Sequence, residues 1–242
     1  MARYNNLRFE KTIDEIEEYI FLNNLQEHEV LPSERKLSEL LAVSRGTLRE
    51  AIIRMCTEGR LYSIQGKGNF VAPVKERIDM GDMISFSRSV ELQSKVPGSR
   101  FVKMYIEDAD ERVMKTLQVT RDERVYILSR VRTINGNNIL LEVTHIPVKY
   151  CKGLEEHDFK KESLYEVLQQ SYGITMKRQD ITVRLSKAAE MEARLLNIST
   201  GSSVFVERAI AFSKDDIPIE YTKTIVNAER AYYSVSIMQV SV

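Results

Sequence analysis

Cysteine is scarce in this sequence, and long apolar runs are missing from it. The two cysteines, Cys56 and Cys151, lie far apart and have neither the spacing of metal ligands nor that of a redox pair. We therefore expect free thiols in a reducing compartment rather than a disulfide framework. The first residues lack the apolar core of a signal peptide, and no apolar run approaches membrane-spanning length. These absences predict a cytoplasmic protein that does not contact a membrane.

Net charge is absent as well, since 35 basic residues balance 35 acidic ones. The balance is uneven along the chain. Residues 1–30 hold three basic and seven acidic residues, whereas residues 31–75 hold eight basic and four acidic ones. A basic stretch behind an acidic one can present a local positive surface without making the whole protein basic.

The groups that enzymes use in catalysis are not apparent in the sequence. We find no nucleophile beside a base, no cluster of metal ligands and no glycine-rich phosphate loop, and Gly66-Lys67-Gly68 fits neither nucleotide-binding template. His145 shares its strand face with Leu141 and has no partner at ligand spacing, so we expect a packed side chain. We therefore predict that the protein has no metal, no cofactor and no enzymatic activity.

Apolar residues recur at helical spacing in the N-terminal part of the chain, which we assign as a domain of residues 1–73. Between residues 9 and 20 they return every three or four positions, which predicts an amphipathic helix. Ser33 and Ser44 are typical N-caps of two further short helices, the second ending near Glu58. Two short helices joined by so tight a turn predict a helix-turn-helix, and the strand, glycine turn and strand of residues 61–71 predict a wing.

The polar side of the third helix offers groups suited to DNA. Arg45, Thr47 and Arg49 lie in its first turns and outside its apolar stripe. The N-terminal end of a recognition helix reaches base edges in the major groove, where arginine pairs with guanine. A solvated polar helix face would explain each residue alone, but the caps, the turn and the wing together favour DNA binding. The predicted DNA-binding residues are Arg35, Ser44, Arg45, Thr47, Arg49, Gly66 and Lys67.

The rest of the chain contains an internal repeat. Residues 74–100 lack clear periodicity and are typical of a linker, and we assign residues 101–242 as a second domain for effector binding and dimerisation. Within it, residues 115–127 match residues 194–206, and 139–144 match 217–222. Each copy predicts strand, helix, strand, turn, strand, and short turns indicate antiparallel neighbours. Shared strand–turn pattern could produce the same likeness, but the matching helix ends favour duplication. We expect an α+β domain in which helices cover an antiparallel sheet.

Charged residues in this second domain suggest an anion site. Arg130 and Arg132 are two apart on one predicted strand, so their side chains share a face. Glu142 lies on the returning arm of the same hairpin, and Ser163 is a predicted N-cap whose helix could bind an anion with its free amides. Surface ion pairs would explain the same residues, but paired arginines beside a helix N-terminus favour an anionic ligand.

Two parts of the sequence resemble a known family. Residues 31–51, LPSERKLSELLAVSRGTLREA, with Glu58-Gly-Arg-Leu and Gly66-Lys-Gly-Asn-Phe-Val, resemble the winged helix of the GntR family. The remainder resembles the HutC branch of that family, whose effector-binding domain is called UTRA. The segments that carry this second resemblance are Ser85-Phe-Ser, Pro97-Gly-Ser-Arg, Arg130-Val-Arg, Leu141-Glu-Val-Thr-His-Ile-Pro, Gly153-Leu, Ser163-Leu-Tyr-Glu-Val-Leu and Pro218-Ile-Glu-Tyr-Thr.

This resemblance implies a set of effector-binding residues. In UTRA regulators that bind phosphosugars, the positions of Arg130, Arg132, Ser163 and Tyr165 hold the phosphate, and those of Glu142 and Glu220 bind hydroxyls. Ser85, Phe86 and Ser87 complete the predicted set, as a segment that could close over the ligand and couple it to the winged helix.

The resemblance also implies a function. We expect a repressor that binds a palindromic double-stranded DNA operator as a homodimer, because one recognition helix reads only a few base pairs. Its effector is expected to be a phosphorylated sugar, with a non-phosphorylated organic acid or an amino-acid-derived metabolite as alternatives. The rival class is an enzyme, because the UTRA fold resembles that of a lyase acting on chorismate.

Overall fold

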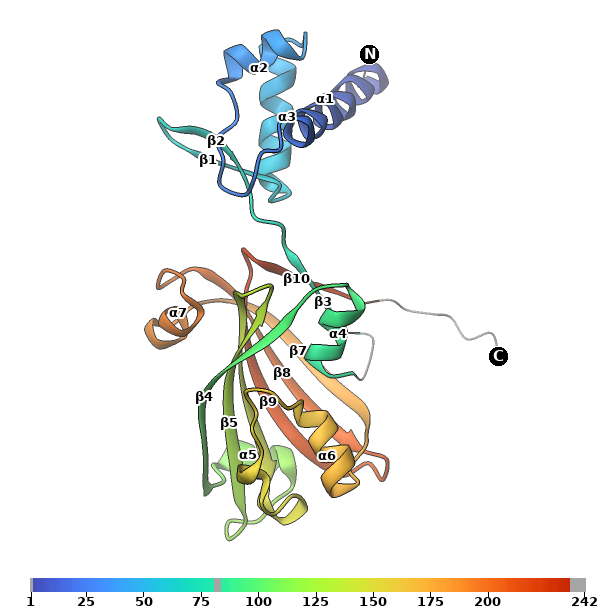
Figure 1. Ribbon diagram of the computed structural model, residues 1–242, viewed down its shortest axis with the longest axis vertical. Helices are drawn as coiled ribbons and strands as arrows, with labels where there is room; N and C mark the ends of the chain where they lie inside the picture. The colour runs from blue at the N-terminus through green and yellow to red at the C-terminus, as the bar shows by residue number, and fades with distance from the viewer. Residues whose placement is uncertain (1, 81–83, 236–242) are drawn as a thin grey trace, which may run out of the picture. The chain divides into compact units, whose positions relative to one another are not determined.

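The computed structural model describes residues 2–80 and 84–235, and it divides the chain between Lys75 and Glu76 into two compact units. The first unit contains three helices followed by a two-stranded hairpin (Figure 1). These elements are α1 (Ala2–Leu22), α2 (Glu34–Leu40), α3 (Arg45–Thr57), β1 (Leu61–Ile64) and β2 (Gly68–Val71). Their order is that of a winged helix-turn-helix.

The three helices share one apolar core. Its members are Ile13, Ile16, Leu31, Leu37, Leu48, Ala51, Ile52, Met55 and Leu61. The Ser33 hydroxyl accepts the Lys36 N–H (3.4 Å) and the Ser44 hydroxyl accepts the Thr47 N–H (3.2 Å), so both predicted caps close the first turns of α2 and α3. Between these helices Ala42 takes a left-handed conformation (φ 52°), which turns the chain within a few residues.

The wing is a short antiparallel hairpin. Leu61 pairs with Val71 and Ile64 with Gly68, and residues 65–67 make the turn. Gly66 (φ +76°) and Gly68 (φ +114°) both have a positive φ, which residues other than glycine rarely adopt. The glycines therefore allow this tight turn to protrude from the first unit.

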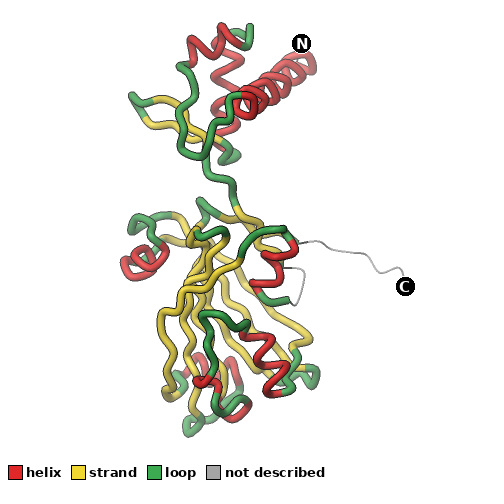
Figure 2. The backbone as a smooth tube through the Cα atoms, viewed as in Figure 1, coloured by secondary structure: helices red, strands yellow, loops and turns green. Residues whose placement is uncertain are grey.

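The second unit is built on an antiparallel sheet of six strands within the described residues (Figure 2). The strands are β4 (Pro97–Asp108), β5 (Arg124–Ile134), β6 (Asn137–Pro147), β7 (Met176–Lys187), β8 (Ser203–Ser213) and β9 (Pro218–Asn227), in the spatial order β4-β5-β6-β9-β8-β7. Thr144 of β6 pairs with Thr222 of β9 at the centre, and their hydroxyls lie 3.0 Å apart. The two residues hold matching places in the sequence repeat, so the predicted α+β fold with an internal repeat is confirmed.

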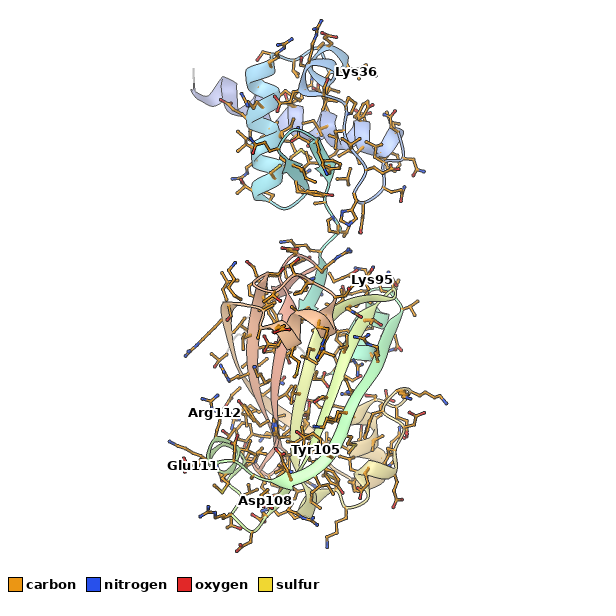
Figure 3. The ribbon with its side chains drawn as sticks, turned by 90° about the vertical axis from the view of Figure 1, so that its left-hand side faces the viewer. Lys36, Lys95, Tyr105, Asp108, Glu111 and Arg112 are labelled. Carbon is orange, nitrogen blue, oxygen red and sulfur yellow. The ribbon has the colours of Figure 1, made fainter. Side chains whose placement is uncertain are left out.

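Helices cover the two faces of this sheet. On one face α5 (Glu111–Leu117) packs against Val125 and Ile127, and α7 (Glu190–Leu196) packs against Val131 and Leu141. Glu111 and Arg112 lie on the outer, exposed surface of α5 (Figure 3). The other face packs against α6 (Leu164–Tyr172) and α4 (Phe86–Leu92). Arg130 and Arg132 belong to this second face, because side chains alternate along β5.

The segment 74–100 differs from the irregular linker that we expected. It contains β3 (Glu76–Asp79), α4 and the beginning of β4, all on the second unit's side of the division. The strand β3 pairs in parallel with β10 (Ala231–Ser234), Glu76 lying opposite Ala231. A four-residue strand whose partner lies about 150 positions away leaves no local periodicity, and this is why the sequence pattern did not indicate it.

Within the described part of the chain, no helix has the length and apolar character needed to cross a membrane.

Candidate functional site

The N-terminal end of α3 carries the predicted DNA-reading residues on its polar side. Ser44, Arg45 and Arg49 are exposed, while Leu48 on the opposite side of the helix is fully buried. Thr47 is partly exposed, and its hydroxyl lies 2.8 Å from the Ser44 hydroxyl. The helix therefore presents two arginines and a hydroxyl to solvent without using them in the core.

Arg45 and Arg49 differ from other arginines of this unit in their ion pairing. Arg35 lies 3.3 Å from Glu39 and Arg54 lies 2.6 Å from Glu58, each one helical turn away. Neither Arg45 nor Arg49 forms an ion pair with another residue that the structure describes. An exposed arginine without an acidic neighbour keeps its full charge available to a phosphate or a base edge.

The wing and α3 border a common groove. Arg49 and Ile53 line it from the helix, and Gly66 and Gly68 line it from the wing. Lys67 is exposed in the turn of the wing. The tertiary structure thus brings Arg49 and the wing glycines, which are separated in sequence, to one surface.

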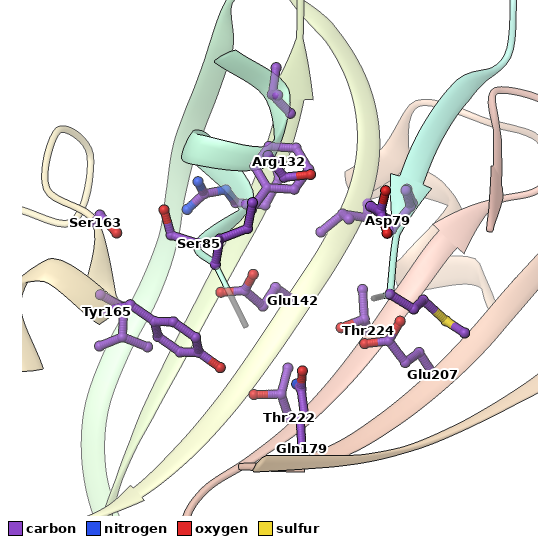
Figure 4. A pocket seen from close by; sticks show the side chains of 18 of the residues that line it. Asp79, Ser85, Arg132, Glu142, Ser163, Tyr165, Gln179, Glu207, Thr222 and Thr224 are labelled. Atoms are coloured by element: carbon purple, nitrogen blue, oxygen red, sulfur yellow. The ribbon is translucent and has the colours of Figure 1, made fainter. Parts of the chain in front are cut away.

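The second unit encloses a cavity of about 150 Å³ against the sheet face that carries Arg130 and Arg132 (Figure 4). Residues from the sheet, β3, α4 and the start of α6 line it. Every predicted effector-binding residue except Ser87 is among them: Ser85, Phe86, Arg130, Arg132, Glu142, Ser163, Tyr165 and Glu220. Ser87 does not line the cavity, but its hydroxyl accepts a hydrogen bond from Arg132 Nη2 (2.8 Å).

Both arginines of the cavity are buried, each with 3% of its surface exposed. Arg130 Nη2 pairs with the Glu142 carboxylate, while its Nε and Nη1 have no hydrogen-bond partner among the described residues. The Arg132 guanidinium lies over the Phe86 ring at 4.7 Å, and its Nε is likewise unpartnered in the described structure. Burial, and secondarily the charge of Arg130, lowers the pKa of Arg132 to about 10 although Glu142 opposes the shift, so it stays charged at neutral pH.

Ser163 precedes α6 at its N-cap position, as predicted, but its hydroxyl does not cap the helix. The hydroxyl is buried and makes no hydrogen bond to any described residue. It lines the cavity beside the first turn of α6, whose backbone N–H groups and dipole favour an anion. The hydroxyl therefore leaves its hydrogen-bonding capacity unused in the described structure.

The cavity acids differ in their ionisation. Burial raises the pKa of Glu142, but the charges of Arg130 and Arg132 outweigh it, and the net shift is downward. Burial raises the pKa of Glu220 to about 7, the charge of Glu142 adds to this, and a hydrogen bond from Thr222 (2.6 Å) opposes it. Burial and the neighbouring Glu220 also raise the pKa of Tyr165, which stays a neutral phenol. Of these two acids, Glu142 is thus ionised at neutral pH and Glu220 is partly protonated.

Sequence reasoning missed several residues that line the same cavity. Thr222 and Thr224 follow Glu220 at alternate positions of β9, so the period of a strand could have identified them. Glu207 of β8, Gln179 of β7 and the β3 residues carried no such signal, because only strand pairing and the position of β3 bring them to the cavity. The missed polar and charged lining residues are Arg77, Asp79, Ser89, Gln179, Glu207, Thr222 and Thr224.

The candidate His145 does not line this cavity. The described residues contain no group of three or more His, Cys, Asp or Glu that could hold a metal. His145 lies partly buried with its Nδ1 3.3 Å from the Tyr221 carbonyl oxygen, and burial lowers its pKa. Its strand neighbour Leu141 belongs to the face covered by α7, which is not the face of the cavity.

Comparison with known proteins matches both units. The family model described as "Bacterial regulatory proteins, gntR family" matches residues 9–71, and that of the UTRA domain matches residues 92–232. The chain is 27% identical to the HTH-type transcriptional repressor NagR of Bacillus subtilis over 90% of this chain and 89% of that protein. It is 25% identical to the mannosyl-D-glycerate transport/metabolism system repressor MngR of Escherichia coli, over 91% and 92% of the two chains.

A solved structure supports the fold over both units. The crystal structure of PhnF from Mycobacterium smegmatis has a TM-score of 0.70 and 26% sequence identity, and the match covers 94% of this chain and 99% of that one. NagR and MngR are both named as repressors. PhnF of Mycolicibacterium smegmatis is named as a transcriptional repressor as well.

Proposed function

The chain belongs to the GntR family of bacterial regulatory proteins, with a UTRA domain behind its DNA-binding unit, and is a transcription regulator rather than an enzyme; from this we propose that it is a repressor whose operator affinity responds to a phosphorylated sugar or a similar small anion. The repressor acts as a homodimer. Arg45, Thr47 and Arg49 read base edges while Lys67 of the wing contacts phosphate.

One observation carries the anionic effector. The cavity gathers four buried donor groups without partners in the described structure, namely Arg130 Nε and Nη1, Arg132 Nε and the Ser163 hydroxyl. Leaving a buried donor unsatisfied costs about 1–3 kcal/mol, and more when the group is charged. An anion at the N-terminus of α6 would satisfy these donors together, which makes the cavity most stable when it is filled.

The sugar part of the proposal is supported by the acids and hydroxyls beside the anion site. Glu142, Glu220 and Thr222 line the same cavity and accept or exchange hydrogen bonds with hydroxyl groups. The name of the relative MngR refers to mannosyl-D-glycerate, a sugar derivative that carries a carboxylate. This relative supports an organic acid with a sugar moiety as the second candidate, bound at the same arginines.

Coupling to the operator is proposed to run through α4 and β3. Phe86 and Ser87 of α4 both contact Arg132, and Ile78 and Asp79 of β3 line the cavity a few residues after Lys75, where the chain divides into its two units. A ligand shifts an equilibrium only through its different affinities for two states. An anion that draws Arg132 toward itself would change the contacts of Arg132 with Phe86 and Ser87 of α4. The position of α4, and with it the path of β3, would change as a result.

The test measures effector binding and operator release on one pair of variants. We expect sugar phosphates to bind the wild type by calorimetry and to release a DNA fragment upstream of its own gene. Arg132→Gln should weaken binding by about 1.5–3 kcal/mol, the worth of hydrogen bonds to a charged group, and should abolish release. Arg124→Gln, at an exposed position of the same strand, should behave like the wild type.

A neutral or cationic metabolite that releases the operator, with Arg132→Gln responding normally, would refute the anion site. The assignment as a DNA-binding regulator would survive that result, because it rests on the family and not on the cavity.

A further inference from the structure

One row of side chains crosses the cavity floor from a cation to an acid. Strand pairing aligns Arg130 of β5 with Glu142 of β6, Glu142 with Thr224 of β9, and Thr224 with Glu207 of β8. All four residues line the cavity. Three strand spacings of about 4.8 Å place the backbones of β5 and β8 roughly 14 Å apart. The cavity is therefore polarised along a line that a small ligand can span.

The close-up view agrees with this arrangement. Ser163 and Ser85 lie on one side of the cavity, Glu207, Thr224 and Asp79 lie on the other, and Glu142 lies between them (Figure 4). The anion donors and Glu207 therefore belong to different ends of the site.

Glu207 lacks the basic partner that two other acids of the cavity have. Glu142 pairs with Arg130, and Asp79 pairs with Arg77 at 2.6 Å. No ion pair joins Glu207 to a base anywhere in the described residues, and the groups that face it include the Tyr233 hydroxyl of β10, the Tyr165 phenol and the carboxylate of Glu142. Burial, with a further contribution from Glu142, raises the pKa of Glu207, and Tyr233 offsets this only in part. A partly buried acid without a cation is stabilised by any ligand that brings one.

The charge of the whole cavity leads to the same requirement. Once the pairs Arg130–Glu142 and Arg77–Asp79 are set aside, the charged groups left among the described lining residues are Arg132 as a cation and Glu207 and the partly protonated Glu220 as acids. A phosphate monoester adds about 1.5 to 2 negative charges at neutral pH. A phosphate carried by a neutral polyol would leave this excess of negative charge uncompensated in a buried space.

We infer that the effector is a zwitterion, held by its anionic group at Arg132 and Ser163 and by a protonated amine at Glu207. This inference rests on the proposed anion site and adds its second pole. Glu207 is then the residue that selects for an amine, and Thr224, its neighbour in the row, is placed to accept a further hydrogen bond from the ammonium group.

The test compares two series of probes that differ in one group. The probes are ω-aminoalkyl phosphates and ω-hydroxyalkyl phosphates with chains of three, four and five carbons, titrated by calorimetry at pH 7.5. We expect the wild type to bind at least one amine probe about tenfold more tightly than its hydroxyl counterpart, a difference of about 1.4 kcal/mol. Glu207→Gln should remove this preference without weakening the hydroxyl probes. Glu229→Gln, an exposed acid of the same unit, should keep it.

Two outcomes would overturn the inference: the wild type binds both series equally, or Glu207→Gln keeps the preference. If both series bind equally and the hydroxyl probes take up about one proton per ligand, measured in buffers of different ionisation enthalpy, the cavity acids are neutralised by protons instead. If neither series binds the wild type, the anion site itself is refuted, and the zwitterion with it. The wild-type comparison needs no mutant, so a folding defect in Glu207→Gln cannot obscure the answer.

Discussion

At the scale of single residues, Arg45 and Arg49 are the predicted DNA-reading charges of α3. Both lie on the polar side of α3 and form no ion pair with another described residue. Removing them takes nothing from the core cluster of Leu48 and Met55. Their contribution should therefore appear in DNA affinity and not in stability.

We expect Arg45→Ala or Arg49→Ala to weaken operator binding by about 1–3 kcal/mol and to relax sequence preference at one base pair, as the loss of a bidentate contact to guanine does. Fluorescence anisotropy with operator variants measures both effects. Arg112→Ala removes the same charge from the exposed surface of α5 and should bind like the wild type. A variant at position 45 or 49 that binds as tightly as the wild type would remove that residue from the reading surface.

Glu220 provides a residue-scale prediction for pH. Burial raises its pKa to about 7 from an ordinary value of 4.5. Between these two values the folded protein holds a proton that the unfolded chain has released, so this group makes the protein less stable as the pH rises through that window. Above about pH 7 the loss is complete, and below about pH 4.5 it is absent.

We expect the wild type to lose about 3 kcal/mol of unfolding free energy relative to Glu220→Gln between pH 4.5 and 7.5. Urea unfolding of both proteins across this range measures the difference, in which the titration of all other groups cancels to first order. Glu229→Gln, which removes an exposed carboxylate of the same unit, is the matched control variant. Parallel curves for the wild type and Glu220→Gln would show that Glu220 ionises normally in the fold.

At the scale of elements, the wing is a hairpin with almost no core of its own. Leu61 and Asn69 are its buried residues, and the turn between them is exposed. Such a turn can approach the DNA backbone closely because Gly66 and Gly68 have no side chains in the way.

We expect Lys67→Ala to weaken binding to all DNA sequences alike and to reduce the slope of log K against log salt by about one unit, since one phosphate contact releases roughly one counterion. Titrations over a range of salt concentrations give this slope. Lys115→Ala, in α5 of the second unit, should leave it unchanged. An unaltered slope for Lys67→Ala would place that lysine in solvent.

At the scale of the whole molecule, symmetry limits how the protein can bind its operator. One recognition helix contacts only a few base pairs, so a specific site needs two of them. A twofold dimer then places its half-sites about 34–36 Å apart, roughly one turn of DNA.

We expect sedimentation to give about twice the 28.0 kDa of one chain. Hydroxyl-radical footprinting should give two protected half-sites related by a palindrome, about 10 base pairs apart from centre to centre. Protection of a single half-site, or a monomer at concentrations that saturate the operator, would refute the dimer.

The DNA-binding unit was largely predictable from the sequence because its structure is encoded locally. The caps at Ser33 and Ser44, the helical spacing of the core residues and the glycines of the wing each act within a few positions of the chain. The period of a strand likewise placed Arg130 and Arg132 on one face, and the repeat put Glu142 and Glu220 in matching positions. Local rules are sufficient wherever the interacting groups are neighbours in sequence.

Only the tertiary structure decided which distant residues share the cavity and what charge they carry. Parallel pairing with β10 turned an apparent linker into β3, and the order of strands put Glu207 in one row with Arg130. The ion pair of Arg130 with Glu142, the raised pKa of Glu220 and the unpartnered Ser163 hydroxyl depend on burial between elements. Strand register, desolvation and charge pairing act through space, so they become fixed only when segments far apart in the chain pack together.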